Sequence, residues 1–185
     1  DLSAEVRKVK SINAELLLAV TGLEDAILAC QEMVKQRFSP MGIIPLGPGW
    51  YEVPFMKALG KYADDAISTI AWYDPRKPLS QELTRVFKGA HPDLEVNLNH
   101  AYTFEAVLVA LDAFRRADST EPGKLIEALR TTNITNNVVT GPGIHFDEKG
   151  QNPNGQASAI QNRGGKNLVI LPKEAAVTKP IWPMR

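Results

Sequence analysis

The residues best suited to binding a ligand follow three short apolar segments. Segments 16–20, 42–46 and 66–71 are followed by Thr21-Gly22-Leu23, Gly47-Pro48-Gly49-Trp50-Tyr51 and Trp72-Tyr73, respectively. Glycine allows backbone N–H groups to approach an anion, and the hydroxyls of Thr21 and Tyr51 offer hydrogen bonds. Aromatic faces suit a flat or apolar group. These residue types predict a pocket for a small carboxylate with a flat or apolar body.

The motifs of common enzymes do not occur in this sequence. There is no Gly-x-Ser-x-Gly and no Gly-x-x-x-x-Gly-Lys. His91, His100 and His145 are isolated and lack the i, i+4 spacing that places two histidines on one helical face for a metal. No acid, base and nucleophile are grouped. We therefore expect a binding protein that is not an enzyme and that has no catalytic residue, metal or cofactor.

The composition excludes several classes of partner. Lys plus Arg and Asp plus Glu both number 21, so the formal net charge is zero and no basic excess favours a nucleic-acid partner. No apolar run approaches the length of a membrane span. The one cysteine, Cys30, lies on the apolar face of a predicted helix. We interpret it as a small buried hydrophobe.

In the first half of the chain, predicted strands alternate with predicted helices, as in an α/β fold. Segment 16–20 is too short for a helix and lacks alternation, which predicts a strand covered on both faces. Helices are predicted at 3–11, 24–36 and 53–61, and from a Ser80 cap to Lys88. Strands recur about every 25 residues with a helix between them, which suits right-handed crossovers in a parallel sheet. Residues 1–92 are thus predicted to form a doubly wound α/β unit.

The pattern changes after residue 92. Segment 97–114 has helical spacing and is apolar nearly all round, with only Glu105 and Asp112 interrupting it. Such a helix is normally buried on several sides, so it should pack inside something larger. The remaining predicted elements are a helix at 122–130 capped by Thr120, a strand at 141–146, a turn at 147–150 and a hairpin of 157–162 with 167–171.

Four segments in order resemble the C-terminal half of a type I periplasmic solute-binding protein of the branched-chain amino-acid and aromatic-acid ABC-transporter group. They are a helix leading into an apolar strand (3–20), a Tyr-x-x-x-Ala helix (102–117), segment 125–132, and the glycine-flanked Phe-Asp segment at 143–150. Together they span almost the whole chain.

The resemblance implies a two-lobed α/β fold of doubly wound parallel sheets, with ligand bound in the cleft between the lobes. It assigns residues 1–92 to the second lobe, 97–150 to the first and 151–185 to a return into the second. The strands of the first lobe would belong to an N-terminal half that this sequence lacks, and the apolar excess of helix 97–114 would reflect that missing sheet. The implied location is the periplasm, and the implied partners are a membrane permease, the N-terminal half and a small carboxylate ligand.

The resemblance also bears on the ligand. In the amino-acid binders an acidic residue just before the third strand takes the ammonium of the ligand, and here Asp65 is the closer match of the pair Asp64-Asp65. Aspartate is one methylene shorter, and the tyrosine expected after the first strand is replaced by Gly22-Leu23. We therefore expect an aromatic or other carboxylate without an ammonium first, and a branched-chain amino acid second.

Two other classes of function compete with a transport component. A ligand-sensing effector domain of a regulator or receptor can have the same fold, but it would carry a helix-turn-helix or a membrane span, and neither occurs in this sequence. An α/β enzyme is disfavoured by the missing catalytic groups. The sequence upstream of this segment would separate transport from regulation, because a signal peptide favours the first and a DNA-binding motif the second.

Overall fold

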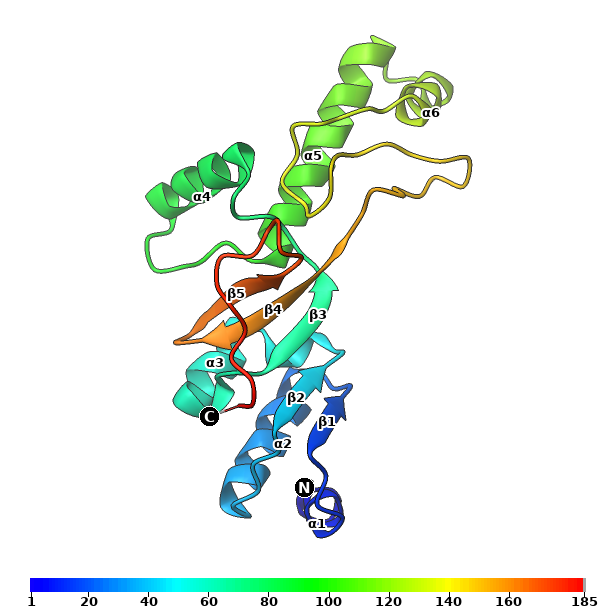
Figure 1. The fold of residues 1–185 in the computed structure, drawn as a ribbon. Helices are drawn as coiled ribbons and strands as arrows, with labels where there is room; N and C mark the ends of the chain where they lie inside the picture. The colour runs from blue at the N-terminus through cyan, green and yellow to red at the C-terminus, as the bar shows by residue number, and fades with distance from the viewer. Residues whose placement is uncertain (185) are drawn as a thin grey trace. The chain divides into compact units, whose positions relative to one another are not determined.

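The computed structural model describes residues 1–184, and the chain divides into two compact units (Figure 1). The first unit contains Asp1–Ile70 and the chain from Ala159 onward, and the second contains Ala71–Ser158. The first unit begins with helix α1 (Ser3–Ser11), strand β1 (Leu16–Ala19), helix α2 (Leu23–Lys35) and strand β2 (Gly42–Pro45). Strands β1 and β2 pair in parallel, with Leu16 opposite Gly42 and Ala19 opposite Pro45. The first crossover is therefore the predicted strand-helix-strand unit.

The third strand departs from the prediction. After the short helices η1 (Pro48–Trp50), α3 (Val53–Leu59) and η2 (Gly60–Ala63), strand β3 (Ile67–Ala71) is hydrogen-bonded to β4 (Ala157–Arg163) and not to β2. Next to it, Asp65 N donates to Asn162 O at 2.8 Å and Asn162 N donates to Ala66 O at 3.1 Å. The prediction of one parallel sheet from all three strands was wrong, because the late hairpin provides this strand with a nearer partner.

Strand β1 is covered on one face, whereas we expected both faces to be buried. Leu17 and Ala19 pack with Val6 and Met33 in the core of the first unit. Leu18 and Val20, whose side chains alternate to the opposite face, are 62% and 74% exposed. The reason is that α1 and α2 supply apolar side chains to one face only. The continuous apolar run did not distinguish a covered face from an uncovered one.

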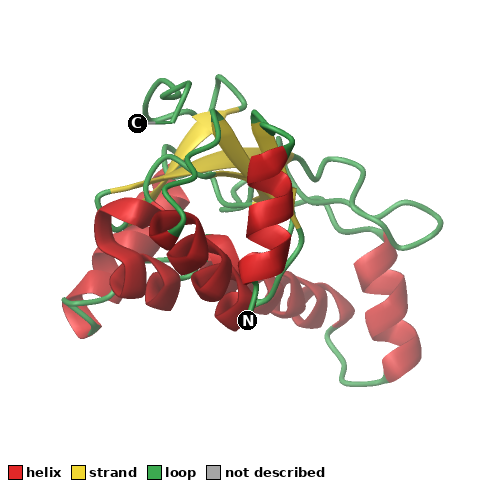
Figure 2. Cartoon of the chain, turned by 90° about the horizontal axis from the view of Figure 1, so that it is seen from below, coloured by secondary structure: helices red, strands yellow, loops and turns green. Residues whose placement is uncertain are grey.

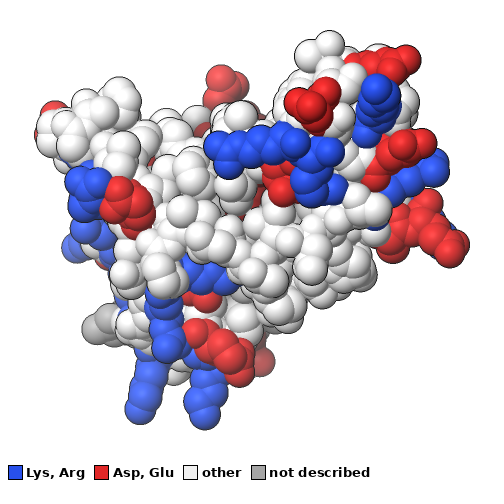
Figure 3. Space-filling model, turned by 90° about the horizontal axis from the view of Figure 1, so that it is seen from above, with Lys and Arg blue, Asp and Glu red and all other residues white. Residues whose placement is uncertain are grey.

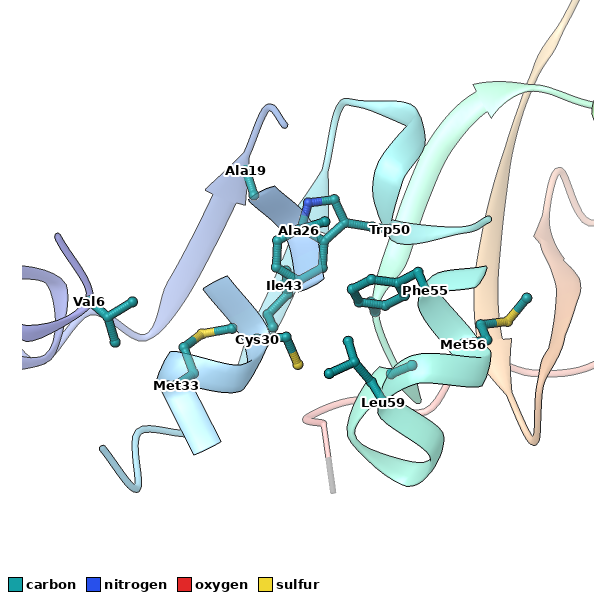
Figure 4. Close-up of a cluster of buried hydrophobic side chains, with 12 residues drawn as sticks. Val6, Ala19, Ala26, Cys30, Met33, Ile43, Trp50, Phe55, Met56 and Leu59 are labelled. Carbon is teal, nitrogen blue, oxygen red and sulfur yellow. The ribbon is translucent and has the colours of Figure 1, made fainter. Parts of the chain in front are cut away.

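The core of the first unit forms around α2. Ala26, Cys30 and Met33 recur at helical spacing and meet Ile43 of β2, Phe55 and Leu59 of α3, and Trp50 (Figure 4). Trp50 and Phe55 have ring centroids 5.3 Å apart. Cys30 is buried, and its burial raises the pKa of the thiol to about 11. The interpretation of Cys30 as a buried core residue is confirmed.

The predicted hairpin forms from β4 and β5 (Lys166–Leu171), which pair antiparallel. Gly164 and Gly165 make the turn with φ values of +55° and +77°, a backbone region that favours glycine. On this hairpin Asn162 lies directly opposite Asn167. The cross-strand pair has both side chains on one face, since opposite residues share a face.

The second unit contains helices α4 (Pro78–Ala90), α5 (Leu98–Ala117) and α6 (Pro122–Arg130). Helix α5 starts at a capping box in which Asn97 accepts from His100 N and the His100 ring accepts from Asn97 N. It packs through Ala101 and Phe104 on Val138 and Val139, whereas Val107, Leu111 and Phe114 are 46–52% exposed. Among residues 1–184 this helix is therefore covered on one side only, whereas the sequence predicted burial on several sides.

A buried carboxylate anchors segment 137–141 to α5. Glu105 accepts from Val138 N at 2.8 Å and from Asn137 Nδ2 at 3.3 Å. Lys77 Nζ donates to Asn137 Oδ1 at 2.6 Å and to Val139 O at 2.7 Å. Burial lowers the pKa of the Lys77 ammonium, against the attraction of Asp74 and Glu105. Glu105, which interrupts the apolar surface of α5, thus binds segment 137–141.

Three local predictions in this unit were wrong. Ser80 and Thr120 are not caps, because α4 and α6 begin at Pro78 and Pro122, and the flanking residues Lys77 and Glu121 make no side-chain cap bond. Proline is favoured at the first helical position, and it starts α4 before Ser80. Helix α6 begins at the predicted Pro122, but its N-cap is Glu121 and not Thr120. Segment 141–146 is not a strand. It forms one isolated bridge between Ile144 and Ile134 within the long loop from 131 to 156, green in Figure 2.

No helix within residues 1–184 is long and apolar enough to cross a membrane. On the face shown in Figure 3, basic and acidic side chains are interspersed. This surface agrees with the balanced formal charge of the sequence.

Candidate functional site

The structure brings two of the three predicted ligand segments together in the first unit. Thr21 follows β1, and Trp50 belongs to the loop that follows β2. The Trp50 indole Nε1 donates to Thr21 Oγ1 at 2.8 Å, and Leu46 N donates to Ala19 O at 2.8 Å just before the loops begin. Because parallel strands end at the same edge, the two loops meet there, as predicted from the strand order.

The glycines in these loops allow one backbone to lie against the other. A Cβ on Gly47 would stand 2.5 Å from Thr21 O, and a Cβ on Gly49 would stand 2.3 Å from Gly22 O. Neither position tolerates a side chain unless the opposite backbone moves. The close approach that we attributed to a ligand is therefore, at Gly47 and Gly49, an approach to the neighbouring loop.

The groups that a ligand could reach at this edge are few. Gly22 and Pro48 are exposed, Thr21, Leu23 and Tyr51 are half-buried, and Trp50 is only 1% exposed. Gly22 is the N-cap of α2, whose first turn carries the exposed acids Glu24 and Asp25. Burial and then the charge of Glu52 raise the pKa of Tyr51, so its hydroxyl remains a hydrogen-bond donor at neutral pH. The site offers the aliphatic side chains of Leu23 and Pro48, two hydroxyls and backbone amides.

Asp65, the residue matched to the family's ammonium ligand, lies in the first unit immediately before β3. It is 4% exposed, and its φ of +68° is a left-handed conformation that aspartate tolerates better than most residues. Its backbone N–H is bound to Asn162 O. A role for its carboxylate in ligand binding stays a prediction.

Trp72 belongs to the second unit. It is 1% exposed and stacks on Tyr73 with ring centroids 5.6 Å apart. Its carbonyl accepts from Thr140 N at 2.9 Å and from Thr140 Oγ1 at 3.0 Å. Within its own unit Trp72 is a packed residue, and its contact with a ligand stays a prediction.

Two residues at this edge were missed from the sequence. Asn162 Nδ2 donates to Trp50 O at 2.6 Å, and Asn167 Nδ2 donates to Tyr51 O at 2.8 Å. A signal existed, because asparagine is depleted in strands and here two flank a Gly-Gly turn. Among residues 1–184 no group of three His, Cys, Asp or Glu side chains could hold a metal.

Comparison with known proteins gives this site a context. The family model described as "Periplasmic binding protein" matches residues 1–166. The "Leu/Ile/Val-binding protein homolog 8" of Brucella abortus (strain 2308) is 23% identical over 193 residues, covering 97% of this chain and 46% of that protein. The chain therefore spans about half the length of the curated relatives it matches.

Solved structures with a similar fold also match this chain over about half of their own length. A leucine-binding protein from Thermotoga maritima MSB8 has a TM-score of 0.77 at 20% identity, covering 91% of this chain and 47% of the other. A fatty acid ABC transporter substrate-binding protein from Thermomonospora curvata has a TM-score of 0.73 at 14% identity, covering 92% and 46%. The fold of the chain is thus that of about half of a periplasmic binding protein.

Proposed function

Because the chain belongs to the periplasmic binding protein family, we propose that it is part of the solute-binding component of an ABC importer. The observation that carries the proposal is the family match over residues 1–166, nearly the whole chain. This family consists of binding proteins and not of enzymes, and its description names the periplasm, as the sequence predicted. The membrane permease of such an importer would be the partner that receives the solute.

We propose a small carboxylate with an aliphatic tail as the ligand. The relatives named above bind leucine, isoleucine or valine, and a fatty acid, according to their names. These compounds share a carboxylate and an apolar tail and differ in the ammonium. The preference for an aromatic acid has no support in those names. An aromatic acid is therefore included in the binding test for comparison.

The residues proposed to contact this ligand are those of the two adjoining loops. The backbone of Gly22 and the hydroxyls of Thr21 and Tyr51 would bind the carboxylate, and Leu23 and Pro48 would contact the tail. Gly47, Gly49 and Trp50 support the proposal by holding the loops against each other. Asp65 and Trp72 remain proposed contacts, Asp65 for an ammonium and Trp72 for an apolar body.

We also propose that the two units belong to different lobes of a complete protein. Residues 1–92 and 151–185 would contribute to the second lobe and 97–150 to the first. The exposed stripe Val107, Leu111 and Phe114 on α5 supports this. The chain also divides into two compact units, but the division falls after Ile70 and after Ser158, so residues 71–92 and 151–158 group with 97–150. A complementary half would cover that stripe with its own apolar surface.

Calorimetric titration of the complete binding protein tests the proposal. The ligands are leucine, valine, dodecanoate and benzoate, with leucinamide as a control that keeps the tail and ammonium but lacks the carboxylate. We expect saturable binding of an aliphatic carboxylate and none of leucinamide. Binding of benzoate alone would show that the protein prefers an aromatic acid, as the sequence predicted. No binding of any of the four carboxylates would contradict the proposed ligand class.

A further inference from the structure

We propose that Asn162 and Asn167 are positioning residues that fix the backbone on both sides of Tyr51 and so aim its side chain at the ligand. The inference rests on the proposed function, in which Tyr51 contacts the ligand. The two asparagines belong to neither predicted ligand loop. Asn162 comes 112 residues after Trp50 in the sequence, and Asn167 comes 116 residues after Tyr51.

The geometry is specific to the peptide groups that flank Tyr51. Asn162 Nδ2 donates to Trp50 O, the carbonyl of the peptide group before Tyr51, at 2.6 Å. Asn167 Nδ2 donates to Tyr51 O, the carbonyl of the peptide group after it, at 2.8 Å. Holding both peptide planes fixes φ and ψ of the residue between them, which sets the direction of its Cα–Cβ bond. Asn162 also donates to Ala63 O at 3.0 Å, which ties the loop to η2.

The hairpin makes the pair act together. Asn162 and Asn167 are opposite each other in the antiparallel register of β4 and β5, so the spacing of their amides is set by the sheet. The other side of the loop rests on Thr21 through the Trp50 indole. Tyr51 therefore sits between two fixed supports, one from the strand ends and one from the hairpin.

Packing alone is a poor explanation for the pair. The Oδ1 atoms of Asn162 and Asn167 are buried and have no hydrogen-bond partner among the described residues. A buried unpaired acceptor lowers the free energy of unfolding, because the loss of its hydration is not offset by a hydrogen bond. Asparagine is also a poor strand residue. Residue types that lower stability are found most often at functional sites. We therefore assign a function to Asn162 and Asn167.

Hydrogen exchange on the full chain tests the positioning in the absence of any ligand. Asn167→Ala removes the hydrogen bond from Asn167 Nδ2 to Tyr51 O and leaves the more deeply buried Asn162 in place. We expect exchange in segment 46–52 to rise about three- to tenfold, the factor for one lost hydrogen bond, with α2 unchanged. The control is Arg163→Ala on the same hairpin, whose side chain donates to Gln161, Thr178 and Lys179 and not to the loop. An unchanged segment 46–52, or an equal rise throughout the first unit, would overturn the inference.

A double-mutant cycle in the complete binding protein tests whether the pair acts through Tyr51. With leucine as the probe, Asn167→Ala should weaken binding about three- to tenfold, and the loss should vanish in a Tyr51→Ala background. An equal loss in both backgrounds would overturn the route through Tyr51. If leucine does not bind the parent protein, the same cycle is read with the carboxylate that does. If none binds, the proposed ligand class fails while the exchange measurement still decides the positioning.

Discussion

Trp50 donates its indole N–H to the hydroxyl of Thr21 at 2.8 Å, across 29 residues of sequence. This bond joins the loop after β1 to the loop after β2, and Trp50 is almost fully buried while making it. The Trp50 ring, which the sequence predicted to face an apolar part of the ligand, packs beneath these two backbone segments. In these two loops the proposed ligand groups are exposed or half-buried residues, namely Thr21, Gly22, Leu23, Pro48 and Tyr51.

Thr21→Val should lower the free energy of unfolding by about 1–3 kcal/mol, because it keeps the shape of the side chain and leaves the buried Trp50 N–H without an acceptor. Urea denaturation followed by tryptophan fluorescence measures the change. Thr69→Val is the matched control, since Thr69 is exposed on β3, and we expect it to change stability by less than about 0.5 kcal/mol. Equal effects of the two substitutions would show that the bond does not contribute to stability.

Gly49→Ala should destabilise the first unit by about 1–3 kcal/mol, because the new methyl would stand 2.3 Å from Gly22 O and the loops would have to separate. Gly123→Ala in α6 meets no atom within 4 Å and should be neutral or stabilising. Thermal denaturation of both variants makes the comparison. A Gly49→Ala protein as stable as the parent would mean that the loops do not lie in contact.

Glu105→Ala should lower the free energy of unfolding by about 1.5–3 kcal/mol, because Val138 N loses a charged acceptor in a buried place. Asp112→Ala on the same helix removes a half-exposed ion pair with Arg116 and should lower it by less than about 1 kcal/mol. Urea denaturation followed by circular dichroism measures both. If Asp112→Ala proved the more harmful, the anchoring of segment 137–141 by Glu105 would be wrong.

Alkaline pH should destabilise the second unit through Tyr73. Burial, and then the charge of Glu95, raises the pKa of Tyr73 from its ordinary value of 10.0 to about 12. A raised folded-state pKa contributes stability that is complete below pH 10 and is lost as the pH rises through 12. The urea midpoint should fall over this window, and Tyr73→Phe should reduce the fall. A parallel decline in both proteins would assign the effect to other groups.

The order and type of most elements could be predicted because the signals are local. The spacing of Ala26, Cys30 and Met33 defines α2, and Gly164-Gly165 defines the hairpin turn. The two caps failed in different ways, since α4 starts at Pro78, before Ser80, whereas α6 starts at the predicted Pro122 with Glu121 as its N-cap. At α4 the proline at the first helical position is the stronger local signal.

What could not be predicted depends on contacts between residues far apart in sequence. No pattern near Trp50 indicates that its indole turns inward to Thr21, or that Asn162 and Asn167 hold the carbonyls on either side of Tyr51. The burial of Glu105 likewise depends on Val138, 33 residues away. The meeting of the loops after β1 and β2 followed from strand order, whereas the contacts of each side chain required the tertiary structure.

The central claim is that the loops after β1 and β2 bind a small carboxylate. Hydrogen exchange of the complete binding protein with and without saturating ligand, using whichever carboxylate binds in calorimetry, tests it most directly. The account predicts that segments 21–23 and 47–51 become protected, and that α6, which carries none of the proposed ligand groups, does not. Saturable binding that leaves both loop segments unprotected would contradict it.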